Sequence, residues 1–259
     1  MNKLGIECKA HHLPPEHEGS EFVVRWGSVG IGRKGHTFVN PRSAISRCSN
    51  KAAARKRMRD FGVPVPEPLK HPYRDNDSWP VIGRPSFHQE GSGFFVCNNY
   101  EEILSAMKSG AEYFSHVFHK TNEFRVHCGH GRVILIQDKE DHKFNREGNF
   151  RTARHEPWWI PYRSNAIKSV MLAGLGATDS LGLDFSAVDV MWNDKDQTCS
   201  VLECNSAPTL DSPLMIRRYA AYFRWLYKYW KEKGVKAPHF KYGDKMDKKE
   251  MWWYLKESK

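Results

Sequence analysis

The chain has no apolar stretch long enough to cross a bilayer, although 40% of its 259 residues are hydrophobic. Its first residues, MNKLGIECKAHH, contain no apolar segment of signal-peptide length. These absences argue against a membrane protein and predict a cytoplasmic one, in the host cytoplasm if the source is viral. The rest of the composition, with 13% aromatic residues, is typical of a folded protein with a large core.

Several chemical signatures are also missing. The six cysteines are scattered with no C-x-x-C pair, and the thirteen histidines include no H-E-x-x-H spacing. No Cys–His or Ser–His–Asp arrangement that would make a nucleophile is visible, and neither is an internal repeat. The sequence therefore predicts no disulfide framework, no zinc site and no covalent catalysis by a side chain.

Positive charge is in excess. Forty Lys and Arg residues against thirty Asp and Glu residues give a net charge of +10. This balance favours polyanionic partners such as nucleotides, phosphorylated metabolites or nucleic acid, and it does not choose among them.

Gly30, Gly32 and Gly35 have the G-x-G-x-x-G spacing of a dinucleotide-binding turn. That turn must open directly into a helix, whose amides receive the pyrophosphate. Here β-prone residues 36–39 and then Asn40-Pro41 follow, and the acidic residue expected about 20 positions on is absent. We therefore interpret the stretch as a glycine loop rather than a nucleotide fingerprint.

Hydrophobic periodicity predicts a mixture of helices and strands. A proline run at Pro64, Pro66 and Pro68 is the clearest domain boundary. The predicted helices are 43–61, 100–108, 165–181 and 214–233, with a further short one near Trp252. The predicted strands are two stretches within 21–39 and those at 81–84, 94–97, 113–118, 124–128, 132–138, 185–192 and 199–203.

The strand pair FSAVDV and LECNSAPTL carries the most informative residues. Strand alternation predicts that Asp189, Glu203 and Asn205 share one face of a sheet. Two carboxylates and an amide oxygen are hard ligands that suit Mg²⁺ (or Mn²⁺) together with nucleotide phosphates. The alternative is a pair of carboxylates on solvent-facing strand positions.

A second stretch, PVIGRPSFHQEGSGFFV, places Arg84 at the end of a buried strand, followed by a loop that Gly91 and Gly93 close. A cation facing the phosphates and a cover over them are what a magnesium–nucleotide site needs. A surface arginine and a plain hairpin are the alternative interpretation.

Together these segments resemble the ATP-grasp superfamily, which includes D-alanine–D-alanine ligase and RimK-like ligases; a phage-type member is one option. LECNSAPTL resembles its E-x-N-x-x-P metal strand, and FSAVDV the strand that supplies an aspartate. PVIGRP resembles the strand with a phosphate-binding cation, where arginine stands in place of lysine. The stretch SNKAAARKRMRDFGVPVPEP resembles the helix and G-x-P-x-P segment, YFSHVFHKTNEFRV the hinge, and FRTARHE the RimK-like basic motif.

The resemblance implies roles for individual residues. Val117 and Phe118 would contact the adenine through their backbone, and Glu123 would accept from the ribose hydroxyls. Arg55 and Arg84 would be the phosphate-side cations, and Arg151 the residue at the transferred phosphate, with Arg154 or Lys139 as substitutes. The candidate substrate residues are Arg33 and Lys34 at the tip of the glycine loop, together with Arg125 and Ser206.

The implied fold class is α+β, with two α+β lobes that clamp ATP, preceded by a short α/β domain. The expected boundaries are residues 1–63 for that truncated N-terminal domain, 64–122 for the first lobe, 123–234 for the second lobe with the metal site, and 235–259 for a basic, aromatic tail.

The implied activity is ATP-dependent amide ligation of a small-molecule or peptide carboxylate with an amine, through an acyl phosphate, with ATP and Mg²⁺ bound. One alternative is a nucleic-acid-binding protein whose ATP-grasp frame is silent, because the C-terminal region carries Trp225, Trp230, Lys231, Lys233, Trp252 and Trp253. Another is phosphoryl transfer without amide formation.

Overall fold

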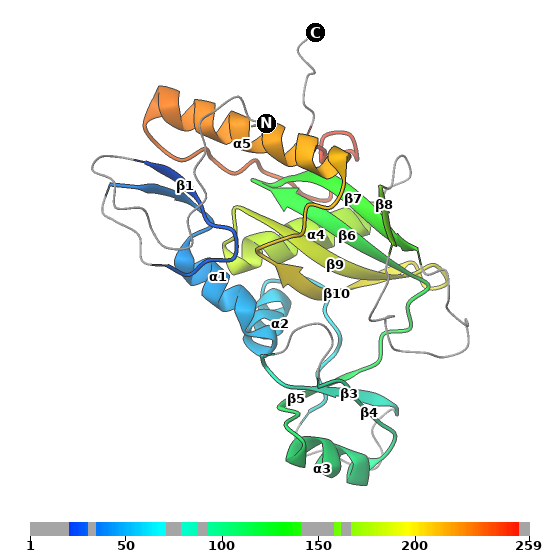
Figure 1. Cartoon of the computed structure of the whole chain (residues 1–259). Coiled ribbons are helices and arrows are strands. Elements are labelled where there is room, and N and C mark those ends of the chain that lie inside the picture. The colour runs from blue at the N-terminus through cyan, green and yellow to red at the C-terminus, as the bar shows by residue number, and fades with distance from the viewer. Residues whose placement is uncertain are drawn as a thin grey trace.

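The computed structural model describes residues 21–30, 35–70, 79–87, 93–140, 158–161 and 167–253. Within them the chain forms a five-stranded sheet, a three-stranded sheet and a two-stranded sheet, with five helices. The five-stranded sheet and the three-stranded sheet lie in separate lobes, and the lobe of the three-stranded sheet is at the lower end of Figure 1.

The large sheet is antiparallel throughout and has the strand order β10-β9-β6-β7-β8. Its strands are β6 (Asn122–Gly129), β7 (Arg132–Glu140), β8 (Trp158–Pro161), β9 (Phe185–Asn193) and β10 (Thr198–Asn205). Alternate residues of β6 and β9, such as Val126 and Val188, point into the main core. Their neighbours in the sequence form the opposite face of the sheet.

Helix α4 (Lys168–Leu181) covers the apolar face. It lies so close that a Cβ built on Gly174 would be 2.8 Å from a methyl carbon of Val126. The helix ends at Gly182, whose φ of 72° is a left-handed conformation that glycine adopts without strain. Most of the helix is buried because α1 and α2 contact it from the other side.

The small sheet has the order β4-β3-β5, with β3 (Val81–Arg84), β4 (Phe95–Cys97) and β5 (Tyr113–His116). Helix α3 (Tyr100–Lys108) packs on it around Ile103 and Phe114. Asn99 caps this helix by accepting from the backbone N–H of Glu102 at 2.9 Å. The strands and the helix predicted here are present, but β4 begins at Phe95 rather than Phe94 and β5 ends at His116 rather than Phe118.

The single helix predicted for residues 43–61 is wrong. The structure has two, α1 (Arg42–Ser49) and α2 (Lys51–Asp60), because Asn50 between them is extended at φ −85°, ψ 101°. The Asn50 side chain accepts from the Ala53 N–H at 2.9 Å and so starts a new helix. The local asparagine cap therefore overrides an otherwise continuous helical pattern.

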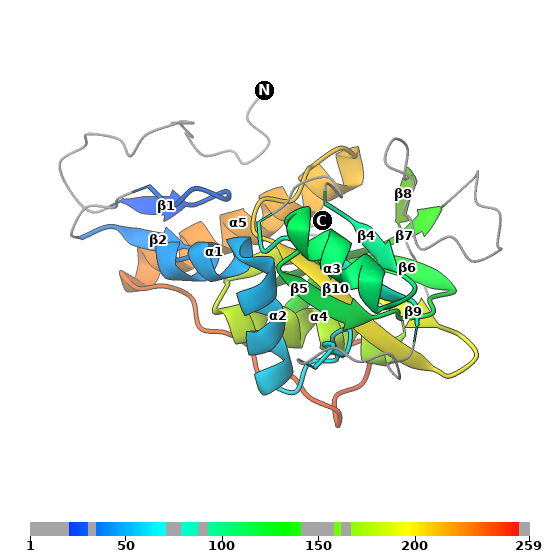
Figure 2. The same ribbon diagram turned by 90° about the horizontal axis from the view of Figure 1, so that it is seen from below.

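The N-terminal strands β1 (Phe22–Val24) and β2 (Thr37–Val39) pair in parallel and lie beside α1, on the opposite side of the molecule from β8 (Figure 2). The element that follows Gly35 is therefore a strand, as predicted, and not the helix that a dinucleotide fingerprint needs. These strands pack against α5, and α1 and α2 pack into the main core, so residues 21–30 and 35–63 share the cores of the larger lobe. The separate N-terminal domain stays a prediction.

Helix α5 (Pro213–Lys233) covers part of the opposite face of the large sheet with Tyr219 and Tyr222. The segment after it folds back along β7, where Trp253 N–H donates to Val133 at 2.7 Å. The short helix predicted near Trp252 is wrong, because this residue forms an isolated bridge with Val133. Trp225 and Trp253 stack edge to face at 4.5 Å between ring centroids, so these rings pack together. Nucleic-acid binding by this region stays a prediction.

None of the helices in the described segments could span a membrane, given their length and apolar content.

Asn40 ties the N-terminal part to the sheet. It is fully buried at φ 61°, its Nδ2 donates to the Phe185 carbonyl at 3.0 Å, and its Oδ1 accepts from the N–H groups of Asp184 (2.8 Å) and Phe185 (3.1 Å). Asn40→Ala leaves these buried backbone groups unpaired and places a less tolerant residue at positive φ. We expect it to lower the free energy of unfolding by about 3–5 kcal/mol in urea denaturation.

Asn40→Gly is the matched control, because glycine adopts positive φ freely. It should cost about 1 kcal/mol less than the alanine variant. Equal and small losses for both variants would contradict the anchoring role of Asn40.

Candidate functional site

A row of charged residues crosses the polar face of the large sheet. Arg125 of β6 lies opposite Asp189 of β9, and Asp189 lies opposite Glu203 of β10. The β10 register shifts between Val201 and Glu203, so Leu202 has no partner on β9. Directly opposite residues share a face, and this places the three side chains in line. Asn205, two residues beyond Glu203, extends the row.

Asp189 and Arg125 form a two-pronged ion pair. Arg125 Nε donates to Oδ1 at 2.7 Å and Nη2 to Oδ2 at 2.9 Å. Burial raises the pKa of Asp189 above its ordinary value, although the Arg125 guanidinium acts in the opposite direction. The carboxylate is thus held in a fixed orientation by one cation.

Glu203 is paired with Lys51, the first residue of α2, at 2.8 Å. Asn205 Nδ2 donates to the other carboxylate oxygen of Glu203 at 3.0 Å. Burial alone would raise the pKa of Glu203, but the Lys51 ammonium group outweighs it and lowers the pKa to about 2. Glu203 is therefore an anion at neutral pH.

Glu123 lies at the other end of the row, next to two ammonium groups. Lys139 donates to it at 3.0 Å from the adjacent strand, and Lys120 forms a second ion pair with it. Its side chain is 4% exposed. Burial acts to raise the pKa of Glu123, but these two lysines hold it below its ordinary value.

Arg55 and Arg84 approach the row from α2 and from the small sheet. Arg55 donates to the Leu202 carbonyl at 3.2 Å, and its guanidinium lies over the Tyr113 ring at 5.3 Å from the centroid. Arg84 lies over the Phe94 ring at 4.8 Å. Burial lowers the pKa of Arg84, and the nearby Arg55 lowers it further. Two cations this close are stabilised by an anion between or beside them.

Among the residues that the structure describes, positive charges outnumber negative charges at this site. Lys51, Arg55, Arg84, Lys120, Arg125 and Lys139 carry six positive charges, against three negative charges on Glu123, Asp189 and Glu203. The excess of three suits a polyanion such as a triphosphate.

No family model matches the chain, but its structure resembles solved ones. D-alanine–D-alanine ligase from Bacillus anthracis complexed with ATP is 18% identical, with a TM-score of 0.52 over 73% of this chain and 66% of that one. VanG D-Ala:D-Ser ligase from Enterococcus faecalis is 17% identical, with a TM-score of 0.53 over 71% and 61%. ATP-grasp ligase PsnB complexed with minimal precursor is 18% identical, with a TM-score of 0.51 over 73% and 65%. The chain has the ATP-grasp fold. It spans about two thirds or less of the length of each of these proteins.

The structure places several of the predicted residues. Val117 and Phe118 are in the segment that joins the small sheet to the large one, and their contact with adenine stays a prediction. Gly93 is at the base of the predicted covering loop, with φ 67° and a built Cβ 2.7 Å from Pro85. Ser206, the residue that follows β10 in the sequence, is 9% exposed. Gly91, Arg33, Lys34, Arg151 and Arg154 lie outside the described residues.

Two cations of this charged site were not among the predicted site residues. Lys51 is one helical turn before Arg55, so both lie on the same side of α2. Lys120 is three residues before Glu123. The sequence could have predicted Lys51, because it lies one helical turn before the predicted cation Arg55. Nothing in the sequence marks Lys120, because the loop that carries it is positioned by the two sheets.

The Glu123 cluster predicts a pH dependence of stability. A depressed pKa in the folded state contributes stability above the unfolded value near 4.5, and this contribution is lost as the pH falls. Glu123→Gln should lower the free energy of unfolding by about 3 kcal/mol at pH 7, because two partly buried lysines lose their counter-charge. The difference from wild type should shrink below pH 4.5, as measured by urea denaturation at several pH values.

Glu101→Gln, at an exposed position in the first turn of α3, is the control and should change little at any pH. A Glu123→Gln loss that is the same at pH 7 and at acid pH would mean that this carboxylate is not held ionised by the two lysines.

Proposed function

We propose that the chain is an ATP-dependent carboxylate–amine ligase that forms an acyl phosphate and releases ADP and phosphate. The observation that carries this proposal is the row of Arg125, Asp189 and Glu203, with its excess of cations, on one face of an ATP-grasp sheet. The ligases with the same fold support this chemistry, one of them complexed with ATP.

The nucleotide would lie between the two lobes. Val117 and Phe118 would offer backbone groups to the adenine, and the buried anion Glu123 would accept from the ribose hydroxyls. Arg55, Arg84 and Lys139 would face the phosphates, beneath the loop that includes Gly91 and ends at Gly93. The arginines suit this role because a guanidinium donates two parallel hydrogen bonds to phosphate oxygens.

The donor set fits Mg²⁺ (or Mn²⁺). Asp189 and Glu203 are adjacent carboxylates, and Asn205 has its nitrogen committed to Glu203, with an amide oxygen of the kind Mg²⁺ takes. When bound, the metal would neutralise charge on the phosphates and on the transferring group. The cations Lys51 and Arg125 would orient the two carboxylates and so fix where that charge is held.

No protein nucleophile is needed. A substrate carboxylate oxygen attacks the γ-phosphorus of ATP, and the bond to the ADP oxygen breaks. An amine then attacks the acyl carbon, phosphate leaves, and the amine loses a proton. Arg84, with Arg151 or Arg154, would stabilise the transferring phosphoryl group, while Arg125 and Ser206 would border the substrate. Positioning between two closing lobes would supply much of the rate.

The glycine loop is proposed as the acceptor side of the cleft. Gly27 has φ 70°, and a Cβ built on it would lie 2.8 Å from Ala207, two residues after Asn205. Arg25 Nη2 donates to the Gly30 carbonyl at 3.1 Å and so fixes where the loop begins. Arg33 and Lys34 follow within the loop and would contact a carboxylate or phosphate of a small-molecule or peptide substrate.

The first test is substrate-dependent ADP release in Glu203→Gln, with mass spectrometry of the product. The variant keeps the shape of the side chain but removes its charge, so we expect turnover to fall by at least about a hundredfold. The exposed substitution Glu101→Gln is the control and should turn over like wild type. Undiminished ADP release in Glu203→Gln would contradict the metal assignment.

Hydroxylamine added to the reaction separates the related activities. An acyl phosphate gives a hydroxamate, whereas direct phosphoryl transfer to a hydroxyl gives none.

The second test reverses the charge of the loop in Arg33→Glu/Lys34→Glu. We expect the KM of one non-nucleotide substrate to rise about tenfold or more, with the KM of ATP unchanged, because the loop is assigned to the acceptor side. Lys231→Glu/Lys233→Glu makes the same charge change at exposed positions at the end of α5 and should leave both values unchanged. A weaker ATP interaction with normal substrate binding would restore the nucleotide interpretation of the glycines.

A further inference from the structure

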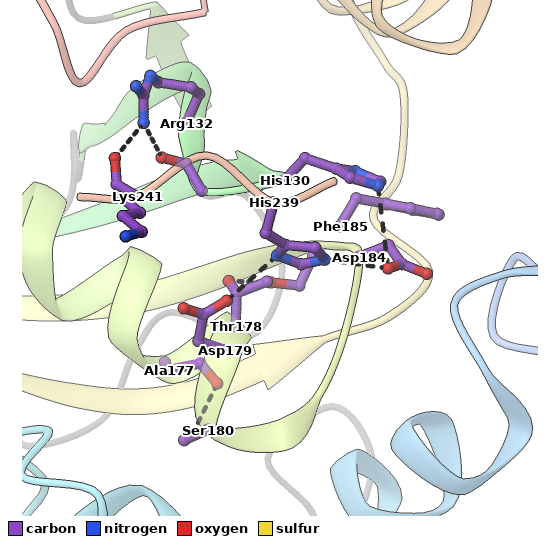
Figure 3. A network of polar contacts seen from close by, with 12 residues as sticks. His130, Arg132, Ala177, Thr178, Asp179, Ser180, Asp184, Phe185, His239 and Lys241 are labelled. Carbon is purple, nitrogen blue, oxygen red and sulfur yellow. Dashed lines mark hydrogen bonds and ion pairs between the residues drawn. The ribbon is translucent and has the colours of Figure 1, made fainter. Parts of the chain in front are cut away.

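Three potential metal ligands meet at the end of the large sheet away from the charged row. His130 is in the turn between β6 and β7, Asp184 lies just before β9, and His239 belongs to the segment after α5 (Figure 3). One ligand atom from each lies within 4.8 Å of the others. The three residues are far apart in the sequence, so no short ligand motif predicts that they meet.

His130 presents a nitrogen lone pair to this cluster. Its ring is fully buried, and Nδ1 lies 2.6 Å from the Tyr222 hydroxyl. When that hydroxyl donates its single proton to the Asp184 carbonyl at 3.1 Å, it accepts from Nδ1–H of His130. In this tautomer the lone pair is on Nε2, and burial lowers the pKa of His130 to about 3, so the ring is neutral. Nε2 makes no hydrogen bond of ordinary geometry and lies 4.0 Å from Asp184 Oδ1, while the Ala237 backbone is close enough to raise the pKa of the ring.

Two acceptors that face each other across a buried gap are unfavourable unless a cation or a donor lies between them. His239 Nε2 reaches Asp184 Oδ1 at 3.2 Å, and its Nδ1 lies 3.4 Å from Asp179 (Figure 3). These two carboxylates raise the pKa of His239 to about 9, so a proton on the imidazole supplies the positive charge in this structure.

The surroundings hold the ligands in the orientation that a metal needs. Asp184 Oδ2 accepts from the Asn40 N–H at 2.6 Å and pairs with Lys236, which leaves Oδ1 facing the histidines. In each histidine the nitrogen that faces away from the cluster, Nδ1, has its own partner. This partner is Asp179 for His239 and Tyr222 for His130. Such outer partners fix the ring and the tautomer of metal-bound histidines.

The backbone brings the third ligand into place. Phe240 N–H donates to the His130 carbonyl at 2.9 Å, and a Cβ on Gly131 would lie only 2.1 Å from the Phe240 carbonyl oxygen. His130 itself has φ 46° in a two-residue hairpin turn, where asparagine is the usual residue.

We propose that His130 Nε2, His239 Nε2 and Asp184 Oδ1 bind a divalent transition metal ion, for which Zn²⁺ is the best match. Two imidazoles and one carboxylate are a frequent zinc donor set, and tetrahedral zinc separates its ligand atoms by about 3.3 Å. The 3.2 Å pair already meets this distance, and the 4.0 Å pair requires a shift of less than about 1 Å. The remaining pair, His130 with His239, lies within 4.8 Å and requires a shift of at most about 1.5 Å. His239 is 37% exposed, so solvent can take the fourth position.

The metal would displace the His239 proton and link the C-terminal segment to the β6–β7 turn. Its role is structural, because the cluster lies apart from the charged row.

The test uses the full chain, freed of metal by a chelator and kept in excess Mg²⁺ to occupy the carboxylate site. Zn²⁺ titration by calorimetry should show one tight equivalent, and Co²⁺ should give the visible absorption of a tetrahedral nitrogen–oxygen site. Zn²⁺ should also raise the Tm by several degrees, because it binds only the folded chain.

His239→Gln should weaken Zn²⁺ binding by at least about tenfold and abolish both the Co²⁺ absorption and the Tm rise. His130→Asn suits the turn and should have the same effect, which keeps the test decisive if one variant folds poorly. His36→Gln, a histidine beside Phe38 outside the cluster, is the matched control and should bind like wild type.

Two results would overturn the proposal. One is a wild-type chain that gives no tetrahedral Co²⁺ absorption. The other is a His239→Gln chain that binds Zn²⁺ as tightly as wild type, since the metal would then lie elsewhere.

Discussion

The shift of register in β10 is the constraint on which the candidate site depends. Val201 points into the main core opposite Val190, so regular alternation would turn Glu203 and Asn205 into that core as well. The skipped residue, Leu202, reverses this, and Glu203 lies opposite Asp189 on the polar face while Cys204 takes the core position. A one-residue irregularity thus decides whether the Glu203 carboxylate and the Asn205 amide are buried in apolar surroundings or exposed to a ligand.

Placing two carboxylates side by side creates a need for positive charge, and the fold meets it from several elements. Lys51 comes from α2, Arg125 from β6 and Arg84 from the small sheet. Because these cations outnumber the carboxylates, the surplus attracts a polyanion and would draw the two lobes together around it. The same charges that stabilise the free protein are thus the ones proposed to bind the nucleotide.

The opposite end of the sheet is organised differently. There α5 and the C-terminal segment cover the polar face with aromatic rings, and buried histidines hydrogen-bond to tyrosines. Asp184 joins three parts of the chain at this end, through Asn40, His239 and Lys236.

The sequence by itself determined the order of most helices and strands, the ATP-grasp resemblance and the residue types of the candidate site. These follow from local periodicity, caps and short motifs, which act within a few residues. The tertiary structure alone decided the pairing of Lys51 with Glu203 and the meeting of His130, Asp184 and His239. Each of these depends on contacts between residues far apart in the chain, which leave no periodic signal in the sequence.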